Sequence, residues 1–407
     1  MSRRTRGEGS IFQRKDKRWT AQFYINGEKK TKTYRTQAEA KEKLLEVKNA
    51  LRQGNYCDPH GMTLGEWFDE WLENYARPSI KLSTYISYET YVRAHIKPAI
   101  GQVKMKDLNV ELLQHFITGK SRSGRADSRK GGLSAKTIKN ILIMLHEALK
   151  QAVENGLIPR NYAEGVHPPK AEEKEMRVLS REEQQALMKV CRESGNPACF
   201  GIIFALFTGV RIGELLGLRW NSVDFANHIF SVKVSLNRLK TFDENSPTAT
   251  TLEPRTPKTK NSKRSIDIID ELYVDLVEHK RQQDEITAKF PGYNPQSYVF
   301  VTAEGNRFDP RTFQDLFHRE VKAAGVKNAN FHCLRHTFAT RSIENGMDIL
   351  VLSKVLGHAK PSTTLNMYGH VLTEHKKDSM QKISSLYSTP ISTVKQQEQD
   401  KELILSL

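Results

Sequence analysis

A short stretch near the carboxyl end, residues 330–370, gathers side chains that could act on an anionic substrate. His332 and Arg335 are three positions apart, so on a helix they lie on the same face, one above the other. His358 follows a Leu-Gly step, and Tyr368 comes ten residues later. The apolar residues between them recur at helical spacing and would bury the opposite faces. We therefore expect the four polar side chains to face one common cleft.

A metal site is the main alternative here, because His332 and His336 are spaced by four residues. The zinc-protease pattern His-Glu-x-x-His needs a glutamate as general base, whereas Cys333 occupies that position. A guanidinium between the two ligands would also repel a divalent cation. We therefore expect neither a metal nor another cofactor.

A further candidate lies in the apolar segment 200–220, FGIIFALFTGVRIGELLGLRW. The pattern predicts one helix up to Phe207, a break at Thr208 and Gly209, and a second helix beyond. An arginine in so apolar a segment is costly to bury unless it is paired or bound to an anion. Glu214, three residues after Arg211, can orient it. Taken alone, this motif would be interpreted as a structural Arg–Glu pair on a helix surface.

Together these motifs resemble those of the tyrosine recombinases, the phage-integrase family. His-x-x-Arg-His, Leu-Gly-His and Ser-Thr-Thr…Tyr are similar to the carboxy-terminal box of that family, and Thr-Gly-x-Arg-x-x-Glu to its earlier arginine motif. The resemblance implies that Arg211 and Arg335 grip a DNA phosphate that Tyr368 attacks. It further implies that His332 accepts the tyrosine proton and that His358 donates a hydrogen bond to the phosphate.

The same resemblance implies a catalytic lysine on a β-hairpin, which protonates the leaving 5′ oxygen. The segment PKTKNSKRSIDI offers Lys258, Lys260 and Lys263 before a predicted strand at 265–268. Register back from that strand selects Lys260, with Lys258 as the competitor. Asp267 stands where related strands often have proline, so the choice between these two lysines stays open.

The composition bounds the class of protein that these motifs serve. A chain of 407 residues is long enough for two or three domains. Lys and Arg outnumber Asp and Glu by 16, and half of that surplus lies in the first 60 residues. Such an excess indicates a polyanionic partner, most simply nucleic acid. No apolar run approaches the roughly 18 residues of a membrane span. The amino terminus lacks an apolar signal core, and the four cysteines lack a regular spacing. We expect a cytoplasmic protein with free thiols and no membrane partner.

The patterning predicts a multidomain α+β chain. Residues 1–55 should form a three-stranded sheet (10–14, 18–25 and 30–35) backed by a helix from Thr36, similar to the arm-site DNA-binding domain of larger integrases. Residues 62–167 should form a helical core-binding (SAM-like) domain that opens with a capping box of Thr63 and Glu66.

Residues 175–387 should form the catalytic domain, mainly helical with a small antiparallel sheet. It opens with a capping box at Ser180 and is expected to hold strands at 229–236, 265–268 and 298–302, with a long insertion at 241–257. Tyr387 is the alternative nucleophile, but no motif surrounds it. The tail 388–407 ends in a small apolar patch that is expected either to dock on a neighbouring subunit or to remain a disordered end.

The resemblance implies a site-specific integrase of a mobile element. Such an enzyme would bind double-stranded DNA at core and arm sites and exchange strands as a homotetramer through a four-way junction. Accessory excision or host DNA-bending proteins are possible partners. The alternatives are a type IB topoisomerase-like nicking-closing enzyme and a non-catalytic DNA-binding regulator.

Overall fold

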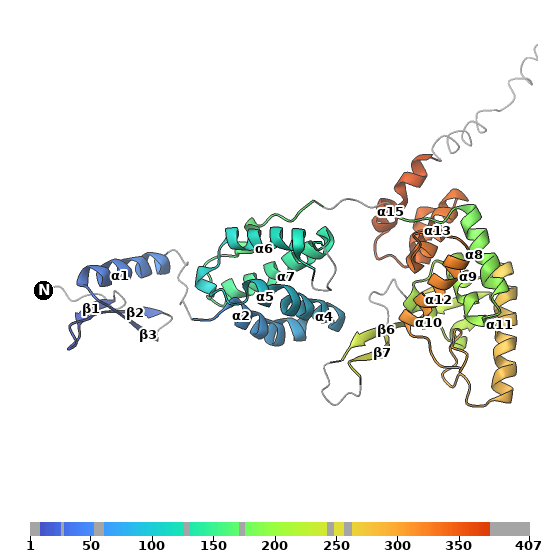
Figure 1. Cartoon of the computed structure of the whole chain (residues 1–407), viewed down its shortest axis with the longest axis horizontal. Coiled ribbons are helices and arrows are strands. Elements are labelled where there is room, and N and C mark those ends of the chain that lie inside the picture. The colour runs from blue at the N-terminus through green and yellow to red at the C-terminus, as the bar shows by residue number, and fades with distance from the viewer. Residues whose placement is uncertain are drawn as a thin grey trace, which may run out of the picture. The chain divides into compact units, whose positions relative to one another are not determined.

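The computed structural model describes residues 9–25, 28–52, 61–125, 131–170, 176–241, 248–255 and 263–374. The expectations for Lys258, Lys260, Tyr387 and the tail at 388–407 lie outside these residues. The chain divides into two compact units, Met1–Glu173 and Lys174–Leu407, coloured blue to green and green to red in Figure 1. Small antiparallel sheets accompany many helices, which confirms the predicted mixed α+β class. The finer division into domains stays a prediction.

The first unit begins with a small antiparallel sheet covered by one helix. Its strands follow the order β1 (Ser10–Gln13), β2 (Trp19–Ile25) and β3 (Glu28–Tyr34), and the helix is α1 (Gln37–Arg52). Ala21 and Phe23 point from β2 to Leu44 of α1, and these three side chains form the buried core of this part. The alternating strand pattern thus supplies one apolar face, which the amphipathic helix covers.

The rest of the first unit is helical. The helices are α2 (Leu64–Trp71), α3 (Arg77–Ser79), α4 (Leu82–Tyr91), α5 (Lys97–Ile100), α6 (Val110–Ser123) and α7 (Ala135–Glu154), with π-helical turns at Leu72–Ala76 and Val92–Ile96. The predicted capping box is confirmed, because Thr63 and Glu66 bond each other's backbone N–H groups. Trp67 is fully buried and donates its indole N–H to the carbonyl of Ala148, at 3.1 Å. This bond ties α2 to α7 inside the core.

The second unit combines helices with two small sheets. The helices are α8 (Arg181–Glu193), α9 (Phe200–Thr208), α10 (Ile212–Leu216), α11 (Asp270–Lys289), α12 (Pro310–Ala323), α13 (Phe331–Glu344), α14 (Ile349–Leu356) and α15 (Pro361–Glu374). One antiparallel sheet has the order β4 (Val223–Asp224), β5 (Ile229–Val232) and β8 (Arg264–Asp267). The other is a hairpin of β6 (Ser235–Lys240) and β7 (Thr250–Arg255), visible in Figure 1. The capping box at Ser180 is confirmed.

Three strand predictions for this unit were wrong. Residues 229–236, expected to be one strand, are divided between β5 and β6, which belong to different sheets because β5 pairs with β8 and β6 with β7. Residues 241–257, expected to be an insertion, contain β7, whose β-branched Thr250 and Thr251 pair with β6 despite the surrounding polar and proline-rich sequence. Residues 298–302 form no continuous strand. They make isolated bridges, and Val299 bonds the carbonyl of Leu218 in a loop. None of the described helices is long and apolar enough to cross a membrane.

Candidate active site

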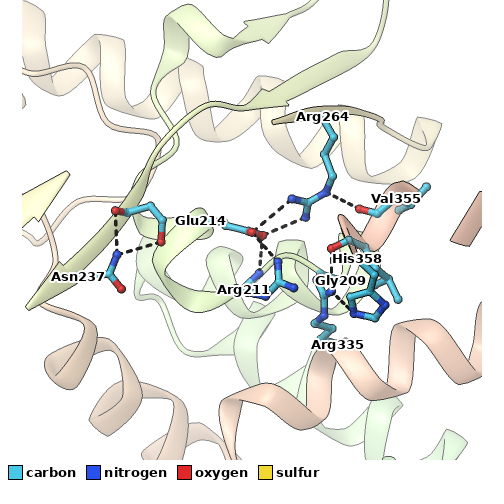
Figure 2. A network of polar contacts seen from close by, with 10 residues as sticks. Gly209, Arg211, Glu214, Asn237, Arg264, Arg335, Val355 and His358 are labelled. Atoms are coloured by element: carbon cyan, nitrogen blue, oxygen red, sulfur yellow. Dashed lines mark hydrogen bonds and ion pairs between the residues drawn. The ribbon is translucent and has the colours of Figure 1, made fainter. Parts of the chain in front are cut away.

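Arg335 is the buried centre of the polar cluster shown in Figure 2. It lies on α13 and is only 2% exposed. Its Nη1 donates to the carbonyl of Gly209 at 2.8 Å. Its Nη2 donates to the carbonyl of Leu356 at 2.7 Å and to Nε2 of His358 at 2.9 Å. One guanidinium therefore joins α13 to the ends of α9 and α14.

Two left-handed glycines place those carbonyls. Gly209 caps α9 with a φ of 63°, and Gly357 caps α14 with a φ of 67° directly after Leu356. The carboxyl end of a helix carries the negative end of its dipole, which favours a cation at that position. The predicted break at Thr208 and Gly209 is thus confirmed. This break directs the carbonyl of Gly209, at the end of α9, toward Arg335.

Arg335 forms no direct ion pair with a carboxylate among the described residues, although the charge of Glu214 acts on it from a distance. All three acceptors of its guanidinium are neutral. Burial, and then the positive charge of Arg211, lower the pKa of Arg335 to about 9, so the group remains charged at neutral pH. A buried cation that lacks a directly paired carboxylate is costly, and a bound anion would offset that cost.

Arg211 lies next to this cluster as the residue before α10. Its Nη1 donates to Oε1 of Glu214 at 2.8 Å, and its backbone N–H donates to Oε2 at 3.0 Å. The Arg211 side chain is 39% exposed, whereas that of Glu214 is 4% exposed. Arg264, from β8, forms a second ion pair with the same carboxylate at 2.9 Å. Together with Arg335, the cluster contains three guanidinium groups and one carboxylate, so its net charge is positive.

His358 has a defined tautomer in this arrangement. An arginine can only donate, so Nε2 of His358 must accept from Arg335. Nδ1 then carries the hydrogen and donates to Oγ1 of Thr364, at 2.7 Å. Burial, and then the charge of Arg335, lower the pKa of His358 to about 4, which keeps the ring neutral. For His358 to donate to a phosphate through Nε2, as expected, this nitrogen must leave Arg335 and gain a hydrogen.

Tyr368 lies on α15 and is only 1% exposed, so its side chain is fully buried and not half-buried as a lone tyrosine usually is. Its hydroxyl lies 2.8 Å from Nδ1 of His336. Burial raises the pKa of Tyr368 to about 12, and burial together with the charge of a protonated His332 lowers the pKa of His336 to about 4. Since Thr364 and Tyr368 are one turn apart, the same face of α15 is held by two histidine contacts.

The structure brings most of the predicted residues together. Arg335 and His358 are in direct contact, and Arg211 lies close enough for its charge to lower the pKa of both groups. His332 lies one turn from His336, with ring centroids 4.6 Å apart, and burial followed by the charge of Arg335 lowers its pKa. The described contacts of Tyr368 include His336 and not His332. In the part of the chain that the structure describes, no cluster of three or more His, Cys, Asp or Glu could hold a metal ion.

Three residues of the site were missed by sequence reasoning: His336, Arg264 and Thr364. His336 ends the His-x-x-Arg-His motif and was weighed as a metal ligand but given no catalytic role, although its spacing of four from His332 places both rings on one helix face. Arg264 directly follows Lys263 in a lysine-rich segment, and no sequence signal distinguishes it from these neighbouring basic residues. Thr364 belongs to the Ser-Thr-Thr motif and could have been found from its position one turn before Tyr368.

Comparison with protein families agrees with this geometry. Residues 177–375 match the phage integrase family, and residues 63–121 match the phage integrase N-terminal SAM-like domain. A tyrosine recombinase XerC-like protein of Caldanaerobacter subterraneus subsp. tengcongensis is 30% identical over 364 residues, which cover 87% of this chain and 90% of that protein. The ICEBs1 integrase of Bacillus subtilis is 25% identical over 260 residues, or 63% of this chain and 67% of the relative.

Solved structures share the fold. A Tn1549 transposon integrase in complex with a circular intermediate DNA superposes with a TM-score of 0.64 at 21% identity, over 79% of this chain and 99% of that one. A lambda integrase tetramer bound to a Holliday junction gives a TM-score of 0.54 at 19% identity, over 89% of this chain and 96% of that one. These two structures were solved on DNA.

Proposed function

The chain belongs to the phage integrase family of tyrosine recombinases, and we propose that it cleaves and rejoins double-stranded DNA at specific sites as the integrase of a mobile element. The main support from the structure is Arg335, a buried guanidinium without a carboxylate partner among the described residues, next to the more exposed Arg211. A phosphodiester is the anion that this pair fits, because planar guanidinium forks match its non-bridging oxygens.

Charge neutralisation is the first contribution of the site. The attacking oxygen and the phosphate are both rich in electrons, and negative charge grows on the phosphate oxygens as the new bond forms. Donors that are already fixed in place stabilise that charge without having to reorganise. The two helix ends that hold Arg335 keep its guanidinium fixed before any substrate arrives.

Bond exchange at phosphorus is the second contribution. The Tyr368 oxygen attacks phosphorus, the bond to the 5′ oxygen breaks, and a 3′-phosphotyrosine forms that conserves the energy for rejoining. The phenolic proton passes to a histidine. His332 is the residue proposed for this role from its motif, and His336 is the one in contact with the hydroxyl. The 5′ oxygen takes its proton from Lys260, with Lys258 as the alternative. The reverse attack by a 5′-hydroxyl restores Tyr368.

Recognition and assembly complete the proposal. The basic amino-terminal sheet would bind arm sites, and the helical part that matches the SAM-like domain would bind the core site. Strand exchange would proceed through a homotetramer on a four-way junction, as the lambda integrase tetramer on a Holliday junction suggests. The protein would act in the cytoplasm, where its DNA lies, with accessory proteins setting direction. No observation favours the topoisomerase-like or the regulatory alternative.

A covalent trapping assay tests this function. The substrate is a nicked duplex that covers the end of the element encoding the chain, so that cleavage releases a short strand and the adduct persists. The intact protein should form a denaturation-resistant protein–DNA adduct, and Tyr368→Phe should form none. Arg335→Lys should slow adduct formation by about 10²- to 10³-fold, because a point charge cannot replace the fork.

Tyr387→Phe is the matched control, since it removes the same hydroxyl from the alternative nucleophile. It should form adduct at the rate of the unmodified protein. An adduct that survives in Tyr368→Phe, or disappears in Tyr387→Phe, would show that the nucleophile is assigned wrongly.

A further inference from the structure

Arg264 is a buried arginine that the mechanism above does not use. It is the first residue of β8, and its side chain is 6% exposed. Figure 2 shows its guanidinium directed at Glu214, with Nη2 at 2.9 Å from Oε2 and Nη1 at 3.3 Å from Oε1. This two-point contact between two buried ions is far from the usual solvated surface pair, so it fixes both groups in orientation as well as position.

Glu214 is shared between Arg264 and Arg211. The same two carboxylate oxygens accept from Nη1 and from the backbone N–H of Arg211. Burial by itself raises the pKa of Glu214, but Arg264 and then Arg211 outweigh it and hold the pKa below its usual value. Arg264 thus does more than Arg211 to keep this carboxylate ionised.

The other side of Arg264 contacts the segment that leads to His358. Its Nε donates to the carbonyl of Val355 in α14. A side chain on Gly357 would approach its Nη1 to 3.0 Å, so the guanidinium lies directly against this glycine. Because Gly357 immediately precedes His358, one side chain links β8, the Glu214 carboxylate and the end of α14.

Building on the proposed function, we propose that Arg264 is a positioning residue: it holds Glu214 so that Arg211 keeps donors available for the phosphate, and it fixes the end of α14 that carries His358. Without Arg264, Glu214 would retain a single guanidinium partner among the contacts described here, Arg211. The full attraction of a buried carboxylate would then draw Arg211 away from the substrate.

The rate of adduct formation in the trapping assay tests this role with three variants. Arg264→Gln should form adduct about 10²-fold more slowly, an effect comparable to loss of one transition-state donor. Arg264→Lys should be intermediate, because it keeps the charge without the fork. Arg192→Gln is the matched control: it removes an arginine of the same unit from an exposed ion pair with Asp275, and it should leave the rate unchanged.

A neutral methylphosphonate at the scissile position separates positioning from general damage to the fold. It removes the anionic charge that Arg211 grips. The deficit of Arg264→Gln relative to the unmodified protein should therefore shrink at least about tenfold on this substrate. An equal deficit on both substrates would overturn the proposal. If Arg264→Gln does not fold, Arg264→Lys carries the same comparison.

The double variant Arg264→Gln with Glu214→Gln completes the test. Because Arg264 is proposed to act through Glu214, the double variant should be no slower than Arg264→Gln alone. Additive losses would overturn the proposal. Adduct formation by the unmodified protein, and its absence in Tyr368→Phe, report on the proposed function separately, so the two ideas can fail independently.

Discussion

At the scale of single residues, the site depends on buried groups whose partners are few and specific. The hydroxyl of Tyr368 lies inside the core and contacts Nδ1 of His336 at 2.8 Å. A buried hydroxyl that loses its partner retains the cost of leaving water without the compensating bond. The contact is therefore a structural requirement as well as part of the site.

Replacement of His336 should show that requirement. His336→Leu leaves the phenol unpaired and should lower the free energy of unfolding by about 1–3 kcal/mol. His336→Asn places an amide atom close to the position of Nδ1 and should retain most of the stability. Urea denaturation of the full chain at neutral pH measures both values. Equal losses in the two variants would mean that the hydrogen bond contributes nothing beyond packing.

The types of residue in the site could be predicted from the sequence, but their hydrogen-bond and ion-pair partners could not. The sequence motifs that contain Arg211, Arg335 and His358 can be recognised from residue spacing alone. The division of Glu214 between two arginines depends on β8 lying against α10, which no local pattern encodes. Likewise, the preference of the Tyr368 hydroxyl for His336 over His332 depends on how α15 lies on α13.

At the scale of elements, the ends of helices matter more than their lengths. Helices α9 and α14 both end at a left-handed glycine, and a carbonyl at the end of each accepts a hydrogen bond from Arg335. A side chain on Gly209 would lie 2.5 Å from Phe338 and 3.0 Å from Leu356. The glycine is therefore needed for its space as well as for its φ of 63°.

Gly209→Ala should destabilise the second unit by about 2–5 kcal/mol, since the cost of a left-handed alanine adds to that of overpacking. Adduct formation should fall with it, because the carbonyl of Gly209 moves. Gly325→Ala is the matched control, with a φ of 71° and no atom near the added carbon, and should cost only about 1–2 kcal/mol. Thermal unfolding compares the two. Equal shifts would show that the space around Gly209 is unimportant.

Helix starts were well predicted at this scale, as were the three strands of the amino-terminal sheet and β8, but the other strands of the second unit were not. Capping boxes at Thr63 and Ser180 are local signals that need no tertiary context. The strand β7 was missed because its Thr-rich and Pro-containing sequence is typical of a loop, and only pairing with β6 makes it a strand. Strand formation is decided by neighbours that are distant in sequence.

At the scale of the whole molecule, the chain has two units with separate hydrophobic cores. Trp67 and Trp71 are buried in the first unit, whereas Trp220 belongs to the second. A core that is complete within one unit can melt without exposing the other. The total charge of +16 is carried by both units together and suits the proposed contact with DNA.

Calorimetry of the full chain should accordingly show at least two unfolding transitions. In the variant Trp220→Phe, intrinsic fluorescence reports mainly on the first unit, so it should follow only one of them. The unmodified chain, in which both units contribute to the fluorescence, is the control. A single transition that coincides in both measurements would show that the two cores unfold as one.

The depth of Tyr368 also bears on what happens between encounters with the correct target. As the proposed nucleophile, a phenol that is 1% exposed would be out of reach of a duplex bound only at the protein surface, and that duplex would remain uncut. Cleavage would then require a movement that exposes the Tyr368 hydroxyl, such as a shift of α15 relative to α13. Specificity for one target site would then be controlled at two steps: by the DNA sequence that the protein binds, and by exposure of the Tyr368 hydroxyl after binding.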